Sequence, residues 1–217
     1  MSWVVVLPAK GNPAGKSRLD ALPERAALAA AFAVDTVSAL LASPRVRRVF
    51  VVTGDPALAA ELRLLGAVIV PETTDHAGVP TEDRLNAAIR QGVGAAQTAF
   101  PDDSLAIVTG DLPALRASVV TATLDLAAAH ALSMVPDAAG TGTTALFTRP
   151  GRTPALHFGP GSRTAHEQAG CVPLDLPAAS PMRRDVDTLE DLDVARGLGL
   201  GPCSRAVLRE PVGPAPH

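Results

Sequence analysis

Short apolar runs and longer alanine-rich segments alternate along the first part of the chain. Four runs rich in valine and isoleucine have the length of buried strands, and they span residues 3–8, 46–53, 67–71 and 105–109. The segments with helical spacing span residues 25–42, 56–65, 82–99 and 116–130. Alternation at this spacing is typical of βαβ units. It predicts a three-layer α/β fold with a mostly parallel sheet, whose site lies along the carboxyl-terminal edge of the strands.

The rhythm of the pattern changes after residue 130. Three further elements are predicted, two strands and a last helix, over residues 132–136, 145–148 and 189–197. The connections 137–143 and 159–162 are irregular and rich in glycine. The segment 201–217 has four prolines and little periodicity, which predicts a tail that lies on the surface or is disordered. We therefore expect one domain over residues 1–200 and a proline-rich C-terminal tail over 201–217.

Composition narrows the classes of function. The chain has 217 residues, 47% of them hydrophobic, yet no apolar stretch approaches the roughly 20 residues that a membrane span needs. The N-terminus lacks the features of a signal peptide, which predicts a cytoplasmic protein. A net charge of −3 and 3% aromatic residues argue against nucleic-acid binding. Cys171 and Cys203 are too isolated for a disulfide framework or a cysteine metal site.

The loop after the first predicted strand carries the only two lysines of the chain, Lys10 and Lys16. The other 17 of the 19 basic residues are arginine, so a lysine kept here presents a compact point charge that arginine does not. Together with Arg18 and the backbone amides around Gly11, these lysines predict a site for a polyphosphate. The alternative is a solvated basic loop.

The spacing of this loop argues against two nucleotide-binding motifs. Between Gly11 and Gly15 stand three residues, whereas a Walker A loop needs four between its glycines. The glycine pattern of dinucleotide-binding folds is also absent after the first strand. What remains is a loop with cations at both ends, which suits the binding of a nucleoside triphosphate.

An aspartate at the end of a predicted strand is the first candidate metal ligand. The fourth apolar run leads into Gly110 and Asp111. Gly110 allows the backbone to approach a ligand closely, and the Asp111 carboxylate can hold Mg2+ against phosphate oxygens. Asp55 stands at the same place after the second strand, but Pro56 follows it directly, so we interpret Asp55 as a helix cap.

Two further candidate metal ligands, Asp185 and Asp187, stand two residues apart in the sequence. In locally extended backbone both side chains project to the same side and would supply the second metal contact. The alternative is that Asp187 or Thr188 caps the last helix, with Glu190 and Asp191 in its first turn. The two roles can coexist across the pair.

Residues 157–163 combine two glycines with Ser162 and Arg163 at the start of a short predicted helix. Free backbone amides, a hydroxyl and a guanidinium in one turn form a site for an anion. With Thr143 and Thr144 upstream, this turn is suited to the phosphate or carboxylate of a small acceptor. An ordinary tight turn is the alternative.

With these motifs in order, the chain resembles the nucleotidyltransferases of the glycosyltransferase-A-like fold. It is most similar to the guanylyltransferase family of deazaflavin coenzyme F-420 biosynthesis, over about residues 3–200. This resemblance is most specific in residues 7–19, 108–113, 157–162 and 185–192. It implies a three-layer α/β/α, Rossmann-like domain with a mostly parallel mixed sheet. It also implies that GMP passes from GTP to phosphoenolpyruvate or 2-phospho-L-lactate, with release of pyrophosphate.

The resemblance also assigns roles to residues. Those that would bind the nucleotide are Leu7, Ala9, Lys10, Gly11, Lys16, Ser17, Arg18, Asn86 and Gly110. The catalytic residues would be Lys10, Lys16, Arg18 and Asp111. The metal ligands for Mg2+ would be Asp111 with Asp185 or Asp187. The acceptor would be bound by Thr144, Gly159 and Ser162.

In the implied reaction a phosphate oxygen of the acceptor attacks the α-phosphorus of GTP. A phosphate monoester is already nucleophilic near neutral pH, so no general base is required, and we interpret His157 and His166 as structural. The alternatives are a cytidylyltransferase, a guanylyltransferase acting on the molybdenum cofactor, and a non-catalytic nucleotide-binding module. The motifs do not distinguish phosphoenolpyruvate from 2-phospho-L-lactate as the acceptor. They also do not indicate an oligomeric state.

Overall fold

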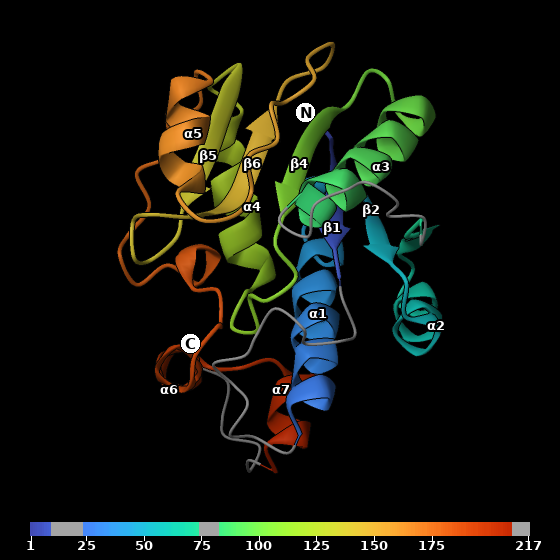
Figure 1. Ribbon diagram of the computed structural model, residues 1–217, viewed down its shortest axis with the longest axis vertical. Helices are drawn as coiled ribbons and strands as arrows, with labels where there is room; N and C mark the ends of the chain where they lie inside the picture. Colours follow the sequence, from blue (N-terminus) through green and yellow to red (C-terminus); the bar gives the residue numbers. More distant parts are fainter. Residues whose placement is uncertain (10–23, 74–82, 210–217) are drawn as a thin grey trace.

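A mixed β-sheet forms the centre of the protein (Figure 1). The computed structural model describes residues 1–9, 24–73 and 83–209. Within these residues seven strands follow the order β3-β2-β1-β4-β6-β5-β7. Their bounds are β1 Trp3–Pro8, β2 Val46–Thr53, β3 Val68–Pro71, β4 Ser104–Val108, β5 Leu132–Pro136, β6 Thr143–Thr148 and β7 Val172–Pro173. Neighbouring strands are parallel except at β6, which runs antiparallel to both β4 and β5.

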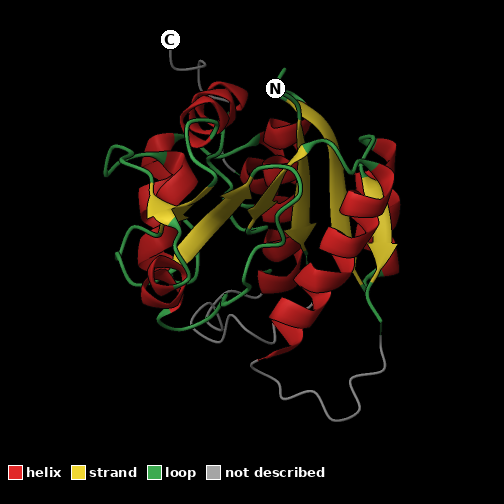
Figure 2. Ribbon diagram, turned by 90° about the horizontal axis from the view of Figure 1, so that it is seen from above, coloured by secondary structure: helices red, strands yellow, loops and turns green. Residues whose placement is uncertain are grey.

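Helices cover both faces of the sheet, as the view in Figure 2 shows. One face packs against α1 (Arg25–Leu41), α2 (Pro56–Leu64) and α4 (Ala117–Ala127), and the other against α3 (Arg84–Ala99). The central strand β1 serves both cores, because Val5 and Leu7 face the first set of helices and Val4 and Val6 face α3. The predicted three-layer α/β/α architecture with a mostly parallel mixed sheet is confirmed.

The ends of the predicted elements agree closely with the structure. Strands β1, β2 and β5 have the predicted bounds, and the other predicted strands and helices differ by one to three residues at their ends. The predicted cap of α2 is confirmed, since Asp55 Oδ1 accepts the N–H groups of Ala57 at 2.9 Å and Leu58 at 3.1 Å. The short strand β7 was not predicted, because two residues are too few to show a period.

A third hydrophobic cluster joins α6 (Leu189–Leu198) to α1. Its buried members are Leu28, Phe32, Ala114, Val186, Leu192, Ala195 and Leu200. Thr188 caps α6, because its hydroxyl accepts the N–H of Asp191 at 3.1 Å while the Asp191 carboxylate accepts the N–H of Thr188 at 2.9 Å. Of the two predicted caps, Thr188 is therefore the one that the structure uses.

The predicted tail is wrong over residues 202–207, which form the helix α7 (Pro202–Val207) against α1. The buried carboxylate of Asp35, within α1, accepts N–H groups from Cys203 at 3.0 Å and Ser204 at 2.8 Å, and the Ser204 hydroxyl at 2.5 Å. Gly201 passes so close that a Cβ there would lie 2.2 Å from Asp35 Cγ. The carboxylate that caps α7 belongs to α1, which is distant in the sequence, so no local sequence pattern predicts this cap.

Replacing Asp35 with alanine is expected to lower the free energy of unfolding by about 2–4 kcal/mol. The change removes charge-assisted hydrogen bonds to the first turn of α7 and leaves buried N–H groups unsatisfied. Urea denaturation measures the effect. The matched control is Asp55→Ala at the cap of α2, where we expect about 1 kcal/mol. Equal losses in the two variants would show that α7 adds no stability.

None of the helices in the described part of the chain combines the length and apolar character that crossing a bilayer requires.

Candidate active site

The carboxyl ends of β1, β4 and β5 meet at one edge of the sheet. β4 and β5 both run antiparallel to the strand between them, β6, so they run in the same direction, and β4 is parallel to β1. The residues that follow β1 and β4 are Ala9 and the segment containing Gly110 and Asp111. This is the edge at which the sequence places the site.

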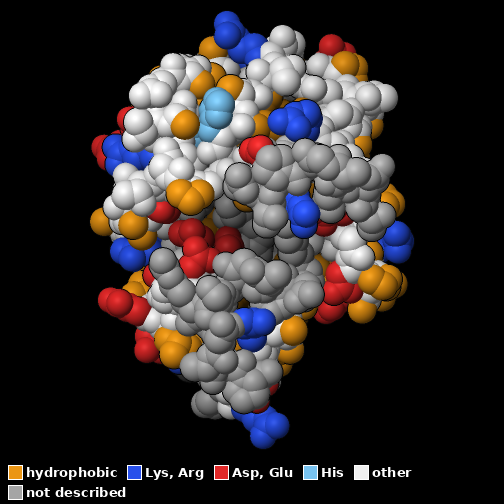
Figure 3. Space-filling model, viewed as in Figure 1, with side chains coloured by type: hydrophobic (Ala, Val, Ile, Leu, Met, Phe, Trp, Pro, Cys, Tyr) orange, Lys and Arg blue, Asp and Glu red, His pale blue; other side chains and the backbone are white. Residues whose placement is uncertain are grey.

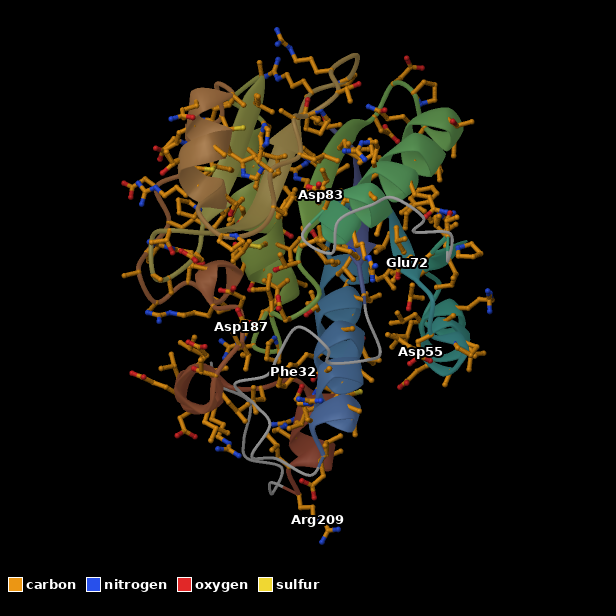
Figure 4. All side chains as sticks on the ribbon, in the orientation of Figure 1. Phe32, Asp55, Glu72, Asp83, Asp187 and Arg209 are labelled. Atoms are coloured by element: carbon orange, nitrogen blue, oxygen red, sulfur yellow. The ribbon has the colours of Figure 1, made fainter. Side chains whose placement is uncertain are left out.

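Four carboxylates gather at this edge. Burial first, and then the negative charges of Asp111, Asp187 and Asp137 in that order, raise the pKa of Asp185 to about 8. The backbone carbonyl of Asp111 accepts the N–H of Val186 at 3.1 Å, which joins the end of β4 to the segment before α6. Figure 3 shows acidic side chains gathered in the middle of this face, and Figure 4 labels Asp187 in that region.

Val186 anchors the backbone between the two neighbouring aspartates, Asp185 and Asp187. Its side chain is fully buried in the third hydrophobic cluster, while Asp185 is half-buried and Asp187 is exposed. Residues 184–187 belong to no helix or strand. Anchored by the valine between them, the two carboxylates lie near enough for the charge of Asp187 to raise the pKa of Asp185. The pairing of either aspartate with Asp111 on a metal ion stays a prediction.

Asp137 was not predicted from the sequence. Its carboxylate accepts N–H groups from Thr141 at 2.9 Å and Gly142 at 2.8 Å, which shapes the turn between β5 and β6. Arg183 donates to the carbonyls of Pro136 at 3.2 Å and Asp137 at 3.0 Å, so it ties the segment before Asp185 to the end of β5. The signal in the sequence was an aspartate directly after a strand, in a glycine-rich turn.

The carboxylates fit a hard divalent cation by their chemistry. Within residues 1–9, 24–73 and 83–209, no three His, Cys, Asp or Glu side chains converge as a complete metal-binding group. Mg2+ commonly uses only one or two carboxylates and completes its shell with water and phosphate oxygens. Asp111 together with Asp185 or Asp187 supplies such a partial set, and a cation there would relieve their mutual repulsion.

The predicted phosphate loop is only partly open to structural description. The residues Lys10, Gly11, Lys16, Ser17 and Arg18 lie outside the described residues, so their roles stay predictions. The side chains of Leu7 and Ala9 are buried in the core. The N–H of Ala9 donates to the carbonyl of Val52 at 2.9 Å. A nucleotide contact at Leu7 or Ala9 would therefore come from the main chain.

Gly110 is a glycine for a reason that differs from the prediction. A Cβ at this position would lie 3.0 Å from the carbonyl oxygen of Pro8 and 3.2 Å from Leu7 Cδ2. The close approach is between the ends of β1 and β4 and not, in this structure, between backbone and ligand. Contact of Gly110 with a nucleotide stays a prediction.

The predicted acceptor turn leads into α5 (Ser162–Gln168). Gly159 and Gly161 have φ angles of 134° and 72°, which favour glycine. Ser162 is buried and its N–H donates to the carbonyl of Gly159 at 3.1 Å. Thr144 is fully buried and its hydroxyl donates to the carbonyl of Met182 at 2.5 Å, so an acceptor contact there would come from the main chain.

Two side chains hold the main chain just before this turn. The Asn86 amide donates to the Phe158 carbonyl at 2.9 Å and accepts the Phe158 N–H at 2.9 Å. His166 Nε2 accepts the N–H of His157 at 3.1 Å, so the ring proton is assigned to Nδ1, which faces Thr143 Oγ1 at 3.0 Å. Burial, and then the nearby His157, lower the pKa of His166 to about 4, so this ring is neutral near pH 7.

Known proteins match this chain over most of its length. The model of the MobA-like NTP transferase domain matches residues 27–179. The phosphoenolpyruvate guanylyltransferase of Streptomyces scabiei (strain 87.22) is 48% identical over 209 residues, which are 95% of each chain. The chain belongs to the phosphoenolpyruvate guanylyltransferase family. A member from Salinispora arenicola (strain CNS-205) is 45% identical over 92% of this chain and 90% of its own length. The chain is thus a nucleotidyltransferase.

Two solved structures have the same fold as this member of the guanylyltransferase family. One is from Desulfovibrio desulfuricans G20 and is described as a nucleotide-diphospho-sugar transferase. It has a TM-score of 0.63 and 20% sequence identity, and the match covers 96% of this chain and 95% of that chain. A 4-diphosphocytidyl-2C-methyl-D-erythritol synthase has a TM-score of 0.58 at 13% identity, over 91% and 98%. At these identities the likeness concerns the fold alone, and it confirms the glycosyltransferase-A-like nucleotidyltransferase fold.

Proposed function

We propose that this chain transfers GMP from GTP to phosphoenolpyruvate and releases pyrophosphate, as a step of coenzyme F-420 biosynthesis. The gathering of Asp111, Asp185 and Asp187 at the carboxyl edge of the sheet carries the proposal, because phosphoryl transfer needs a concentrated set of hard oxygen ligands. The names of relatives up to 48% identical support the choice of guanine and of phosphoenolpyruvate. 2-Phospho-L-lactate is the second candidate acceptor.

The chemistry is a single displacement at phosphorus. A phosphate oxygen of the acceptor forms a bond to the α-phosphorus of GTP, and the bond to the pyrophosphate oxygen breaks. No general base is required, because the phosphate monoester is already a competent nucleophile. The protein aligns the two substrates and neutralises their charge. In this scheme the turn at Gly159 and Ser162 binds the acid, and Lys10, Lys16 and Arg18 bind the GTP phosphates.

A bound Mg2+ would neutralise charge on the phosphate oxygens of GTP during the displacement. Asp111 with Asp185 or Asp187 would hold it.

Cys171 and Cys203 are free thiols, as is usual in a reducing compartment, and we propose that the reaction takes place in the cytoplasm.

The proposal is tested by supplying each nucleoside triphosphate with each acceptor in the presence of Mg2+. Pyrophosphate is measured and the adduct is identified by mass. We expect an adduct whose mass equals GTP plus phosphoenolpyruvate less pyrophosphate. A product formed from CTP would instead indicate a cytidylyltransferase. Binding of GTP without pyrophosphate release in any mixture would indicate a non-catalytic module.

Lys16→Arg is expected to lower the rate about 10- to 150-fold at saturating GTP, although it conserves charge. The broad, planar guanidinium would displace phosphate oxygens that an ammonium group meets singly, with a loss of roughly 1.5–3 kcal/mol. Lys10→Arg should behave similarly. The control is Arg48→Lys on the exposed side of β2, which should leave the rate unchanged. Wild-type rates in both lysine variants would mean that the loop is only solvated.

A further inference from the structure

The main chain at His157 and Phe158 is held from two sides. From one side, the Asn86 amide on α3 makes a two-bond pairing with the Phe158 peptide groups. From the other, His166 on α5 accepts the His157 N–H, and its ring lies against the Phe158 ring with centroids 5.1 Å apart. Asn86 is 8% exposed and His166 is fully buried, so both are built into the interior.

We propose that Asn86 and His166 are positioning residues that set the main chain of residues 157–158 and thereby present the turn 159–162 to the acceptor. This inference rests on the proposed function, which assigns that turn to the acceptor. It also gives Asn86 a role other than the predicted nucleotide contact. Its amide is committed to Phe158 through both its donor and its acceptor group.

The turn needs such support because of its own backbone. Gly159 and Gly161 both occupy positive φ, and a glycine loses more conformational freedom on ordering than any other residue. A Cβ at either position would meet nothing within 4 Å, so neighbouring side chains do not confine these two residues. The anchors just before the turn therefore fix where it begins.

The two anchors connect the turn to the sheet by independent routes. Asn86 lies on α3, which packs against β1 and β2. His166 reaches β6 through Thr143 Oγ1, 3.0 Å from its Nδ1. Truncating either side chain removes its bond to the main chain of residues 157–158 without replacing a residue of β1, the strand after which the predicted phosphate loop begins. This separation makes the inference measurable.

The ring of His166 offers a matched pair of variants. His166→Gln places an amide oxygen near the position of Nε2, so it can still accept the His157 N–H. His166→Asn places an amide nitrogen near Nδ1, so it keeps the bond to Thr143 and loses the acceptor for His157. Only the first change preserves the bond to the main chain before the turn.

The experiment measures kcat and the KM values for phosphoenolpyruvate and GTP. We expect Asn86→Ala and His166→Asn each to raise the KM for phosphoenolpyruvate about tenfold, with the KM for GTP within about twofold of wild type. His166→Gln should recover most of the loss. The control is Gln97→Ala, which removes another amide-to-carbonyl bond from α3, to Arg152, and should change neither KM. Asn86→Asp, which keeps the acceptor for Phe158, replaces Asn86→Ala if that variant does not fold.

Three outcomes would overturn the inference. A rise in the KM for GTP in Asn86→Ala would mean that Asn86 contacts the nucleotide. A lower melting temperature with unchanged kinetic constants would make both residues merely structural. Equal behaviour of His166→Gln and His166→Asn would show that the bond to His157 does not matter. Failure of the proposed function is seen separately, because wild-type protein would then form no adduct with phosphoenolpyruvate.

Discussion

Asp111→Asn is expected to lower turnover about 100- to 1,000-fold while the melting temperature stays within a few degrees of wild type. Asparagine keeps the shape of the side chain but loses the charge that would hold a divalent cation against the phosphates. The backbone carbonyl that accepts the Val186 N–H is unchanged by the substitution. Steady-state rates over a range of Mg2+ concentrations, with thermal melting of the same samples, measure both quantities.

The control for this prediction is Asp55→Asn. Asp55 occupies the same place after β2 but caps α2, and asparagine is an equally good cap. We expect its turnover and stability to match wild type. Unchanged turnover in Asp111→Asn at saturating Mg2+ would show that Asp111 has no part in catalysis.

Asp185→Asn is expected to raise the stability of the fold and lower turnover about 100- to 1,000-fold. The raised pKa means that the folded chain keeps a proton on Asp185 up to about pH 8, whereas the unfolded chain loses it near pH 3.8. Asp185 therefore contributes stability that is fully present below pH 3.8 and is lost as the pH rises through 8. Asparagine carries no charge and avoids this loss, which we place at about 1–3 kcal/mol.

Urea denaturation at pH 5 and pH 8.5 without added metal tests the sign. The free energy of unfolding of Asp185→Asn should exceed that of wild type, and the excess should be larger at pH 8.5. A destabilised variant, or an excess that shrinks as the pH rises, would contradict the assignment of Asp185 to a repulsive cluster. Stabilisation with full activity would place the metal on Asp187 instead.

The sheet could be predicted because its strands carry their own signal. Val4, Val5 and Val6 are buried on both faces, so the central strand reads as an unbroken apolar run between alanine-rich helices. The position of Asp111 after β4, at the carboxyl edge of the sheet, follows from the same pattern. So does the cap at Asp55, because a short-range hydrogen bond requires only neighbouring residues.

The features that escaped prediction depend on contacts distant in sequence. Asp137 joins the acidic cluster because β5 runs parallel to β4, which depends on the reversal of β6 between them. Asn86 pairs with Phe158, 72 residues further along the chain. No periodic pattern or short motif in the sequence indicates that Asp137 lies near the other aspartates or that Asn86 pairs with Phe158. Gly110 was predicted to let the backbone approach a ligand, whereas in the fold a Cβ there would meet Pro8 and Leu7 at the end of β1.

The junction of Asp35 with α7 bears on the order in which the chain acquires its structure. Asp35 and Ser204 are 169 residues apart, so α1 leaves the ribosome long before the amides that its carboxylate binds. Until residues 203–204 are synthesised, the Asp35 carboxylate lacks these hydrogen-bond donors and is bound by water instead. The packing of α1 around Asp35 is then incomplete. Fraying at a chain end is normally local. Here, loss of α7 would leave the charge of Asp35 buried in α1 without its partners, so α1 and α7 should protect one another from proteolysis.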